Sequence, residues 1–253
     1  MPVKKTAAAR LTLREVMATL EKAGTAQNRK IYARHGAEEP MFGVSFAELK
    51  KLRKRIGIDH DLACALWETG NSDARTLAIR VADPERMSPA DLDRWLSSVR
   101  YPFLVGAVAQ LAGDGPHAEK KARQWLRKGD ERQGQAAWAL VAHVALRNEA
   151  LPDDWFGERL ADIEAQVHDA PNRQREAMNQ ALIAIGCRSP SLRRAAAATA
   201  RRIGKVEVDH GETGCKTPDA AAYIEKAWEH ARSKGFPSPA AQERSRESIR
   251  TRC

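Results

Sequence analysis

Residues 134–146 read GQAAWALVAHVAL, and this stretch decides the fold. Wound as a helix, it is apolar over most of its circumference, because alanine, valine and leucine fall on every side. A helix of this kind is buried on more than one side, and small residues every three or four positions let neighbouring helices approach closely. The stretch therefore predicts an inner helix of a larger helical array.

Two other segments share this composition, DARTLAIRVAD (73–83) and EAMNQALIAIG (176–186), and each follows a more amphipathic segment. Outer amphipathic and inner buried helices that alternate with a period of roughly 40 residues are typical of HEAT or armadillo-like repeats. We therefore expect an all-α superhelical repeat of antiparallel helix pairs, with a compact irregular bundle as the alternative. The six tryptophans fall within helical periods, so packing between repeats is their expected role.

Helix boundaries are marked by capping residues and by glycine. Ser45 followed by Glu48 predicts a capping box at the start of one helix. Thr217 followed by Pro218 predicts another helix start, because proline is tolerated in the first turn. Gly235 is expected to end that helix. These signals divide the chain into about a dozen helices of ordinary length.

The domain organisation follows from where the apolar period stops. Residues 1–235 are expected to form a single HEAT-like-repeat domain. The remaining residues 236–253, FPSPAAQERSRESIRTRC, lack an apolar period and are rich in serine, proline and arginine. Such a composition buries too little apolar surface to order a chain, so we expect a disordered basic tail.

Composition and charge narrow the class of partner. Lys and Arg number 42 against 33 Asp and Glu, a net charge of +9, which suggests nucleic acid first and a membrane surface second. No stretch reaches the roughly 18 apolar residues that a membrane span needs, and the scattered cysteines show no metal-binding spacing. We expect a cytoplasmic monomer that binds neither a membrane nor a metal.

The basic residues concentrate in three segments, on one face of each expected helix. A concave repeat surface lined with Lys and Arg matches the backbone of double-stranded DNA and binds it through counterion release, without reading its sequence. Solvated outer faces of amphipathic helices are the alternative for any one cluster. The residues expected to contact DNA are Arg29, Lys30, Arg34, Lys50, Lys51, Lys54, Arg194, Arg201 and Lys205.

A polar loop, KVEVDHGETGCKTP (205–218), gathers residue types that carry chemistry. Asp209, His210 and Glu212 are candidates for acid–base catalysis, and Cys215 is a candidate nucleophile. One His, one Cys and two carboxylates match no standard metal-ligand spacing. The alternative is a connector whose polar side chains bind backbone groups and helix ends.

Beyond these patterns, much of residues 25–230 resembles the AlkD-type DNA alkylation repair proteins, which are HEAT-like-repeat DNA glycosylases. The match is distributed along the chain rather than confined to one short motif. The segments that carry it are QNRKIYARHG (27–36), MFGVSFAELKKLRKRI (41–56), LWETGNSDARTLAIRVADP (66–84), DRWLSSV (93–99), QAAWALVAHVALRN (135–148), NQALIAIG (179–186) and RIGKVEVDHGETGCKTPDAAAYI (202–224).

The resemblance implies a monofunctional DNA N-glycosylase that excises N-alkylated purines without a cofactor. Active members hold the DNA backbone in the concave face, where an aspartate near the deoxyribose stabilises the developing positive charge. Two tryptophans flank the lesion, and an arginine holds a phosphate.

This sequence departs from that pattern at the functional positions. Tyr101 takes the first aromatic position and Val105 the position of the acid, while Gln135 and Gln180 stand where the arginine and the second tryptophan are expected. We expect Tyr101, Gln135 and Gln180 to face DNA. Excision then depends on other residues or is absent, and a protein-binding scaffold without enzymatic activity is the remaining alternative.

Overall fold

The computed structural model describes residues 10–127 and 129–252. Within these ranges the secondary structure is fourteen α-helices, one short 3₁₀ helix (η1, Pro84–Arg86) and an isolated β-bridge between Gly24 and Val44. The helices are α1 (Leu13–Ala23), α2 (Ala26–Arg34), α3 (Phe46–Ile56), α4 (His60–Glu68), α5 (Ser72–Val81), α6 (Pro89–Ser97), α7 (Pro102–Gly113), α8 (Ala118–Arg127), α9 (Glu131–Arg147), α10 (Asp153–Gln166), α11 (Asn172–Gly186), α12 (Pro190–Ile203), α13 (Ala220–Ser233) and α14 (Pro239–Arg244).

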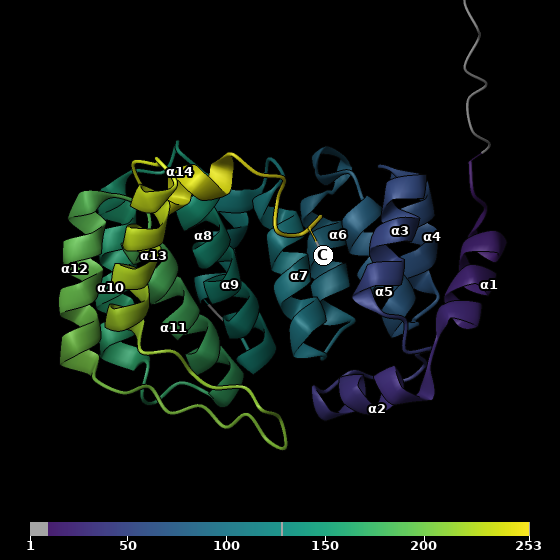
Figure 1. The fold of residues 1–253 in the computed structure, drawn as a ribbon, viewed down its shortest axis with the longest axis horizontal. Helices are drawn as coiled ribbons and strands as arrows, with labels where there is room; N and C mark the ends of the chain where they lie inside the picture. The colour runs from purple at the N-terminus through teal and green to yellow at the C-terminus, as the bar shows by residue number, and fades with distance from the viewer. Residues whose placement is uncertain (1–9, 128, 253) are drawn as a thin grey trace, which may run out of the picture.

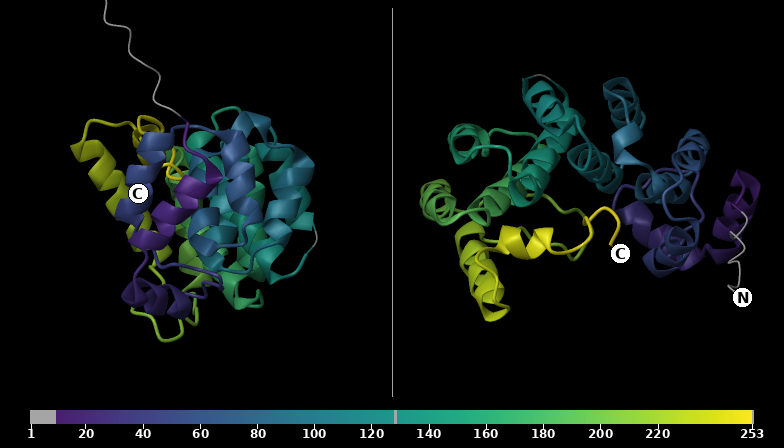
Figure 2. Two further views of the ribbon diagram at one scale, coloured as in Figure 1. Left: turned by 90° about the vertical axis from the view of Figure 1, so that its right-hand side faces the viewer. Right: turned by 90° about the horizontal axis from the view of Figure 1, so that it is seen from above.

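The helices stand side by side in two rows that follow an arc (Figures 1 and 2). Seen from above, α5, α7, α9 and α11 form the inner row, and α4, α6, α8, α10 and α12 form the outer row. Each outer helix from α4 to α10 is followed by an inner helix that runs back along it. The all-α, HEAT-like prediction is therefore confirmed.

The inner row is the core because its helices are rich in small residues. Helix α9 packs against α7 on one side and α11 on the other, with Ala136, Ala137 and Leu140 fully buried. Close approach recurs where α11 meets α13, because a Cβ atom at Gly186 would lie 2.5 Å from the side chain of Ile224. No larger residue fits there without a shift of one helix.

The six tryptophans pack between helices, as predicted, and each is at most 4% exposed. Trp67 of α4 and Trp95 of α6 stack with parallel rings whose centroids are 4.1 Å apart. Trp125 of α8 donates its indole N–H to Asp93 of α6 at 2.8 Å. The outer row is thus held together by aromatic contacts between successive repeats.

Of the two helix starts predicted from capping residues, the structure confirms the one at Ser45 and not the one at Thr217. The Ser45 hydroxyl accepts the Glu48 backbone N–H at 3.3 Å and so caps α3. The start predicted at Thr217 is wrong, because Asp219 caps α13 by accepting the Ala222 backbone N–H at 2.8 Å. Thr217 is instead occupied by a side-chain hydrogen bond within the preceding loop.

The disorder expected for residues 236–253 does not hold for residues 236–252. This segment forms α14 and then crosses the inner side of the arc toward α7 and α5 (Figure 2). Ala240 is fully buried, and its backbone N–H donates to the carbonyl of Cys187 at 3.1 Å. The segment is ordered by partners far away in the chain, which its own composition does not reveal.

Arg250 fixes the far end of this segment. Its side chain is 4% exposed and its Nε donates to Asp114 at 2.9 Å. Its guanidinium also donates to the backbone carbonyls of Ile79 and Ala82, at the C-terminal end of α5. Asp114 in turn contacts His143 of α9 at 2.9 Å. We call residues 245–252 the C-terminal strap, since they join α14 to the C-terminal ends of α5 and α7.

Along the described part of the chain, no helix is both long and apolar enough to cross a membrane.

Candidate nucleic-acid interface

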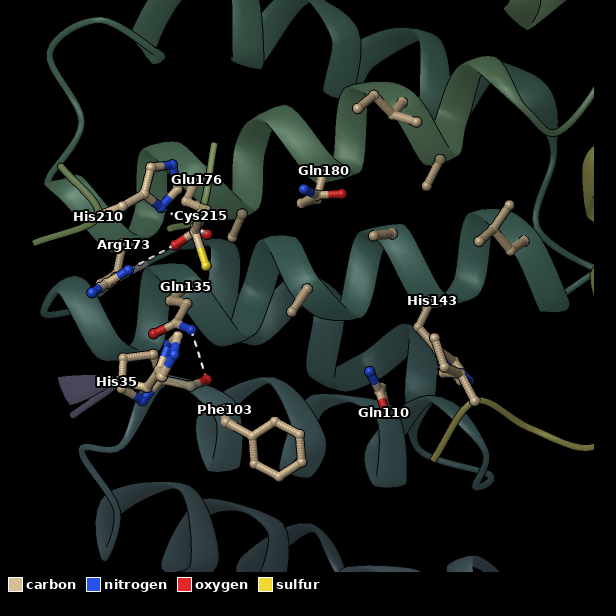
Figure 3. A pocket seen from close by; sticks show the side chains of 18 of the residues that line it. His35, Phe103, Gln110, Gln135, His143, Arg173, Glu176, Gln180, His210 and Cys215 are labelled. Atoms are coloured by element: carbon tan, nitrogen blue, oxygen red, sulfur yellow. Dashed lines mark hydrogen bonds and ion pairs between the residues drawn. The ribbon is translucent and has the colours of Figure 1, made fainter. Parts of the chain in front are cut away.

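The inner side of the arc encloses a cavity of about 890 Å³ (Figure 3). Its walls are the exposed sides of α7, α9 and α11. Helices α2, α3 and α13 and the 205–218 loop also contribute, with α14 and the C-terminal strap along one edge. The cavity therefore joins segments from the N-terminal helices to the C-terminal strap, while none of the described residues of the outer row lines it.

Four aromatic rings form a continuous series at the α2 end of the cavity. The ring centroids of Tyr32 and Phe46 are 6.0 Å apart, those of Phe46 and Phe103 5.4 Å, and those of Phe103 and Tyr101 5.6 Å. Phe46 is 38% exposed and Phe103 37%. The guanidinium of Arg80 contacts the rings of both phenylalanines, at 5.3 and 5.9 Å from their centroids. We call these four residues the aromatic cluster.

A buried carboxylate positions this cluster. Asp73, at the start of α5, accepts the backbone N–H groups of residues 42–44 at 2.6–3.0 Å. Those amides precede α3, whose first residue is Phe46. Gly43 has a positive φ of 78°, and a Cβ there would lie 2.5 Å from the carbonyl of Thr25, so only glycine suits this close approach. Because three amides occupy Asp73, it serves as an anchor rather than a free acid.

Amide side chains line the middle of the cavity. Gln135 of α9 donates to the carbonyl of Pro102 at 2.9 Å, which ties α9 to the start of α7. Gln180 of α11 is exposed and projects into the cavity, as does Gln110 of α7 (Figure 3). Burial raises the pKa of the Tyr101 phenol to about 12, so that group stays protonated and neutral at ordinary pH. The cavity thus offers neutral donors and acceptors beside aromatic faces.

Formal charges in the cavity wall cancel. Arg173 donates to Glu176 at 3.0 Å, and Arg147 contacts Glu243 at 3.3 Å. These are the Arg, Lys, Asp and Glu residues that line the cavity in the described part of the chain. The concave wall was expected to be basic, and at the cavity it is neutral and rich in aromatic and amide groups.

The nine basic residues predicted to contact DNA lie outside the cavity wall. Three of these basic residues lie on α2 at the edge of the cavity, because Ile31 and Tyr32 of α2 and the following His35 line the cavity. Helix α2 carries Arg29, Lys30 and Arg34, and α3 carries Lys50, Lys51 and Lys54. Helix α12 carries Arg194 and Arg201, and Lys205 follows that helix. Ion pairs of 2.6–2.7 Å join Arg29 to Glu39, Lys51 to Glu48 and Lys205 to Glu207.

The three uncharged residues predicted to face DNA, Tyr101, Gln135 and Gln180, all line the cavity. Val105 is fully buried in α7 and does not reach it. The position at which the resemblance places an acid is therefore part of the core.

The three predicted catalytic residues of the 205–218 loop do not converge. His210 alone reaches the cavity, with its Nε2 2.9 Å from the hydroxyl of Thr217 and its Nδ1 3.9 Å from Glu176. The carboxylate of Asp209 accepts the backbone N–H of Gly211 at 2.8 Å and so closes a turn. Glu212 is exposed and does not line the cavity.

The loop is held in place through its backbone. The side chain of Asn172, at the start of α11, exchanges two hydrogen bonds of 2.8 Å with the backbone of Asp209. Cys215 lines the cavity and is exposed, with its thiol free. Among the described residues, no group of three His, Cys, Asp or Glu side chains is arranged to hold a metal ion. These contacts fit the connector interpretation of the loop.

Asp114 joins the C-terminal strap to the cavity wall through His143, which lines the cavity. Burial alone would raise the pKa of the Asp114 carboxyl. Hydrogen bonds from His143, Ser248 and Arg250 outweigh burial and hold that pKa well below its usual range. Asp114 is therefore an ionised structural group that links the strap to α7 and α9.

Several cavity residues escaped the sequence patterns. Phe46 fits the apolar stripe of α3 and reads as a core residue, yet it is the first residue of that helix and its ring is part exposed. Phe103 lies two positions after Tyr101, but nothing local shows that its ring reaches the cavity. Arg173 and Glu176 read as the polar face of a helix. The one available signal was that α3 and α7 each have a phenylalanine in their first turn, Phe46 and Phe103.

The paired helices of the arc define an all-α, HEAT-like-repeat protein. The sequence profile of the DNA alkylation repair enzyme family matches residues 16–224, and the chain belongs to this family.

Two curated relatives and one solved structure are similar over most of the chain. The uncharacterized proteins Lin0241 of Listeria innocua serovar 6a and Lmo0209 of Listeria monocytogenes serovar 1/2a are each 28% identical over 205 residues, which span 78% of this chain and 89% of theirs. The solved structure is described as a new family of proteins related to the HEAT-like repeat DNA glycosylases with affinity for branched DNA structures. It is 30% identical, with a TM-score of 0.80, and the match covers 89% of this chain and 97% of that one.

Proposed function

We propose that this protein binds branched DNA and does not excise bases from it. The observation that carries the proposal is the state of the carboxylates in the concave cavity. Among the described residues, the two that line it are Glu176 and Glu243, and each is ion-paired with an arginine.

Excision of an alkylated purine leaves positive charge on the deoxyribose, and a carboxylate lowers that barrier only if its own charge is not already compensated. Arginine at about 3 Å cancels most of the field that Glu176 could direct at a sugar. Val105 in the core and Asp73 under three backbone amides supply no replacement. The site is thus chemically suited to binding rather than to breaking a glycosidic bond.

DNA binding is supported by the family, by the net charge of +9 and by the similar structure with affinity for branched DNA. The basic residues of α2 at the cavity edge can bind phosphates, whereas both arginines in the cavity wall are already paired with glutamates. A branch point exposes strands that leave the duplex at an angle, which suits an arc with cationic edges better than a straight duplex does.

A paired assay tests the proposal. Binding of a three-way junction and of a straight duplex with the same arm sequences is measured at two salt concentrations, and release of methylated purine from methylated duplex is measured with the same protein. We expect tighter binding to the junction, weaker binding at the higher salt concentration, and no release above the spontaneous rate. Catalytic release would overturn the non-excising account, and equal affinity for junction and duplex would overturn the preference for branched DNA.

A further inference from the structure

The exposed apolar side chains of this protein are concentrated in one place. Six large hydrophobic residues are exposed in the described part of the chain, and five of them line the concave cavity. The five are Ile31, Phe46, Phe103, Tyr223 and Ile249, and the sixth, Ile58, lies outside it. A patch of exposed apolar side chains on a solvent-facing surface marks a binding site.

We propose that this cavity receives an unpaired nucleobase of the bound DNA, which stacks on the aromatic cluster. The inference rests on the proposed DNA binding and goes beyond it by naming what enters the cavity. A base held in a fully paired duplex cannot leave its stack without an energetic penalty, whereas a base left unpaired at a junction or gap is available.

The aromatic cluster has the form that stacking requires. Phe46 and Phe103 present part-exposed rings at 58° to one another, so together they offer a face and an edge to a planar ligand. The guanidinium of Arg80 lies against both rings and supports them from below. Bases of every sequence have a π face, so this mode of binding selects for unpaired bases and tolerates any of the four.

Polar groups that share the cavity with the rings match the edge of a base. Gln110 and Gln180 carry amides, which donate and accept hydrogen bonds without a charge. Both line the same cavity as the aromatic cluster. Neutral hydrogen-bonding groups next to aromatic faces are the arrangement that recognises nucleobases in single-stranded nucleic acids.

The distribution of charge separates the base from its phosphates. Inside the cavity the two arginines are neutralised by glutamates, which gives a phosphate no net attraction. Lys30 and Arg34 lie on α2, each one position in sequence from a residue that lines the cavity, Ile31 and His35 respectively. Arg29 contributes less, because Glu39 pairs with it at 2.7 Å. A nucleotide thus fits with its base inside and its phosphates along α2.

The test uses the full-length protein and junction DNA that carries one unpaired 2-aminopurine, whose fluorescence falls when it stacks. We expect the unaltered protein to quench this probe, and Phe103→Ala to abolish the quenching. The variant should also bind the junction roughly tenfold more weakly, which is the loss of one stacked base. Phe103→Trp should restore both, because a larger ring supports stacking as well.

Ile58→Ala is the matched control, since Ile58 is 52% exposed yet lies outside the cavity. It should leave quenching and affinity unchanged, and circular dichroism should show that all variants are folded. A fully paired junction gives the second comparison, and Phe103→Ala should bind it as the unaltered protein does. Loss of affinity for both junctions by the same factor, or binding without quenching, would overturn the inference while DNA binding stands. Failure of the unaltered protein to bind any junction would remove the proposed function, and the base site with it.

Discussion

At the scale of single residues, the partners of a side chain decide its role. Asp73 and Glu176 lie on inner-row helices, and Asp114 directly follows another. Asp73 accepts three backbone N–H groups. Asp114 binds the buried Arg250 and His143, and Glu176 pairs with the partly exposed Arg173. Sequence identifies each only as a polar residue. It does not reveal the partners of Asp73 and Asp114, because these come from segments 29 or more residues away, whereas Arg173 lies only three residues before Glu176.

Arg250 provides a direct stability prediction. Arg250→Gln removes a buried charge whose guanidinium binds Asp114 and two backbone carbonyls, and leaves those acceptors without their donor. The free energy of unfolding should fall by about 3 kcal/mol, the usual effect of breaking a buried ion pair from one side. Urea denaturation measures this. Arg246→Gln, an exposed position in the same segment, should change little, and equal losses in both variants would contradict the role given to Arg250.

Asp114 predicts how stability depends on pH. Its pKa in the folded protein is below the value of about 3.9 that applies to the unfolded chain. The stabilisation from Asp114 is therefore fully present above that unfolded value and is lost as the pH falls toward the folded pKa. Asp114→Asn should lower stability at neutral pH and flatten the decline below about pH 4 relative to the unaltered protein. Parallel curves for the two proteins in that acid range would contradict this assignment.

The candidate site could be predicted from sequence only in part. The resemblance led to Tyr101, Gln135 and Gln180, and all three line the cavity. Phe46 and Phe103 come together from helices more than 50 positions apart, so no local pattern pairs them. The basic residues were expected on the concave wall and lie outside the cavity lining, because helical periodicity gives only the face of a helix and not its place around the arc.

At the scale of helices, residue size determines how closely elements approach. Inner helices were predictable because alanine-rich composition and burial on several sides go together. The C-terminal strap was not, because its partners lie far away along the chain: Arg250 binds Asp114 and Ile79, 136 and 171 residues earlier, and Glu247 pairs with Arg53. A segment with few apolar residues is read as disordered unless its long-range partners are known.

Two glycines in helices provide a matched pair of predictions. Gly186→Ala should destabilise the protein by roughly 1–3 kcal/mol, because its Cβ would lie 2.5 Å from Ile224 where α11 meets α13. Gly157→Ala, in α10 with no atom within 4 Å of the added Cβ, should instead stabilise it by up to about 1 kcal/mol through helix propensity. Thermal unfolding of both variants checks the pair. Stabilisation by Gly186→Ala would show that α11 and α13 are free to separate.

At the scale of the whole molecule, the placement of charge matters more than its sum. The cavity is neutral, its α2 edge is basic, and a second basic cluster lies on α12 in the outer row. If branched DNA occupies the concave side, these two clusters must contribute differently to affinity even though they carry similar charge.

The two clusters can be separated by charge removal. Lys30→Gln combined with Arg34→Gln should weaken binding to every junction sequence alike and reduce the salt dependence by about one unit of slope per residue. Arg194→Gln combined with Arg201→Gln removes the same charge from α12 and should leave both quantities unchanged. Titrations at several salt concentrations measure both. The opposite ranking of the two double variants would place DNA on the outer row.

The C-terminal strap has a mechanical consequence for a protein built this way. Arrays of stacked repeats tend to melt piecemeal from their ends, because each unit touches only its neighbours. Here Arg250, which follows the last helix, binds backbone carbonyls at the C-terminal end of α5 and so links two distant parts of the array directly. Separation of the C-terminal helices from α5 and α7 must therefore break the contacts of Arg250, and the array from α5 to α14 should melt as one cooperative unit.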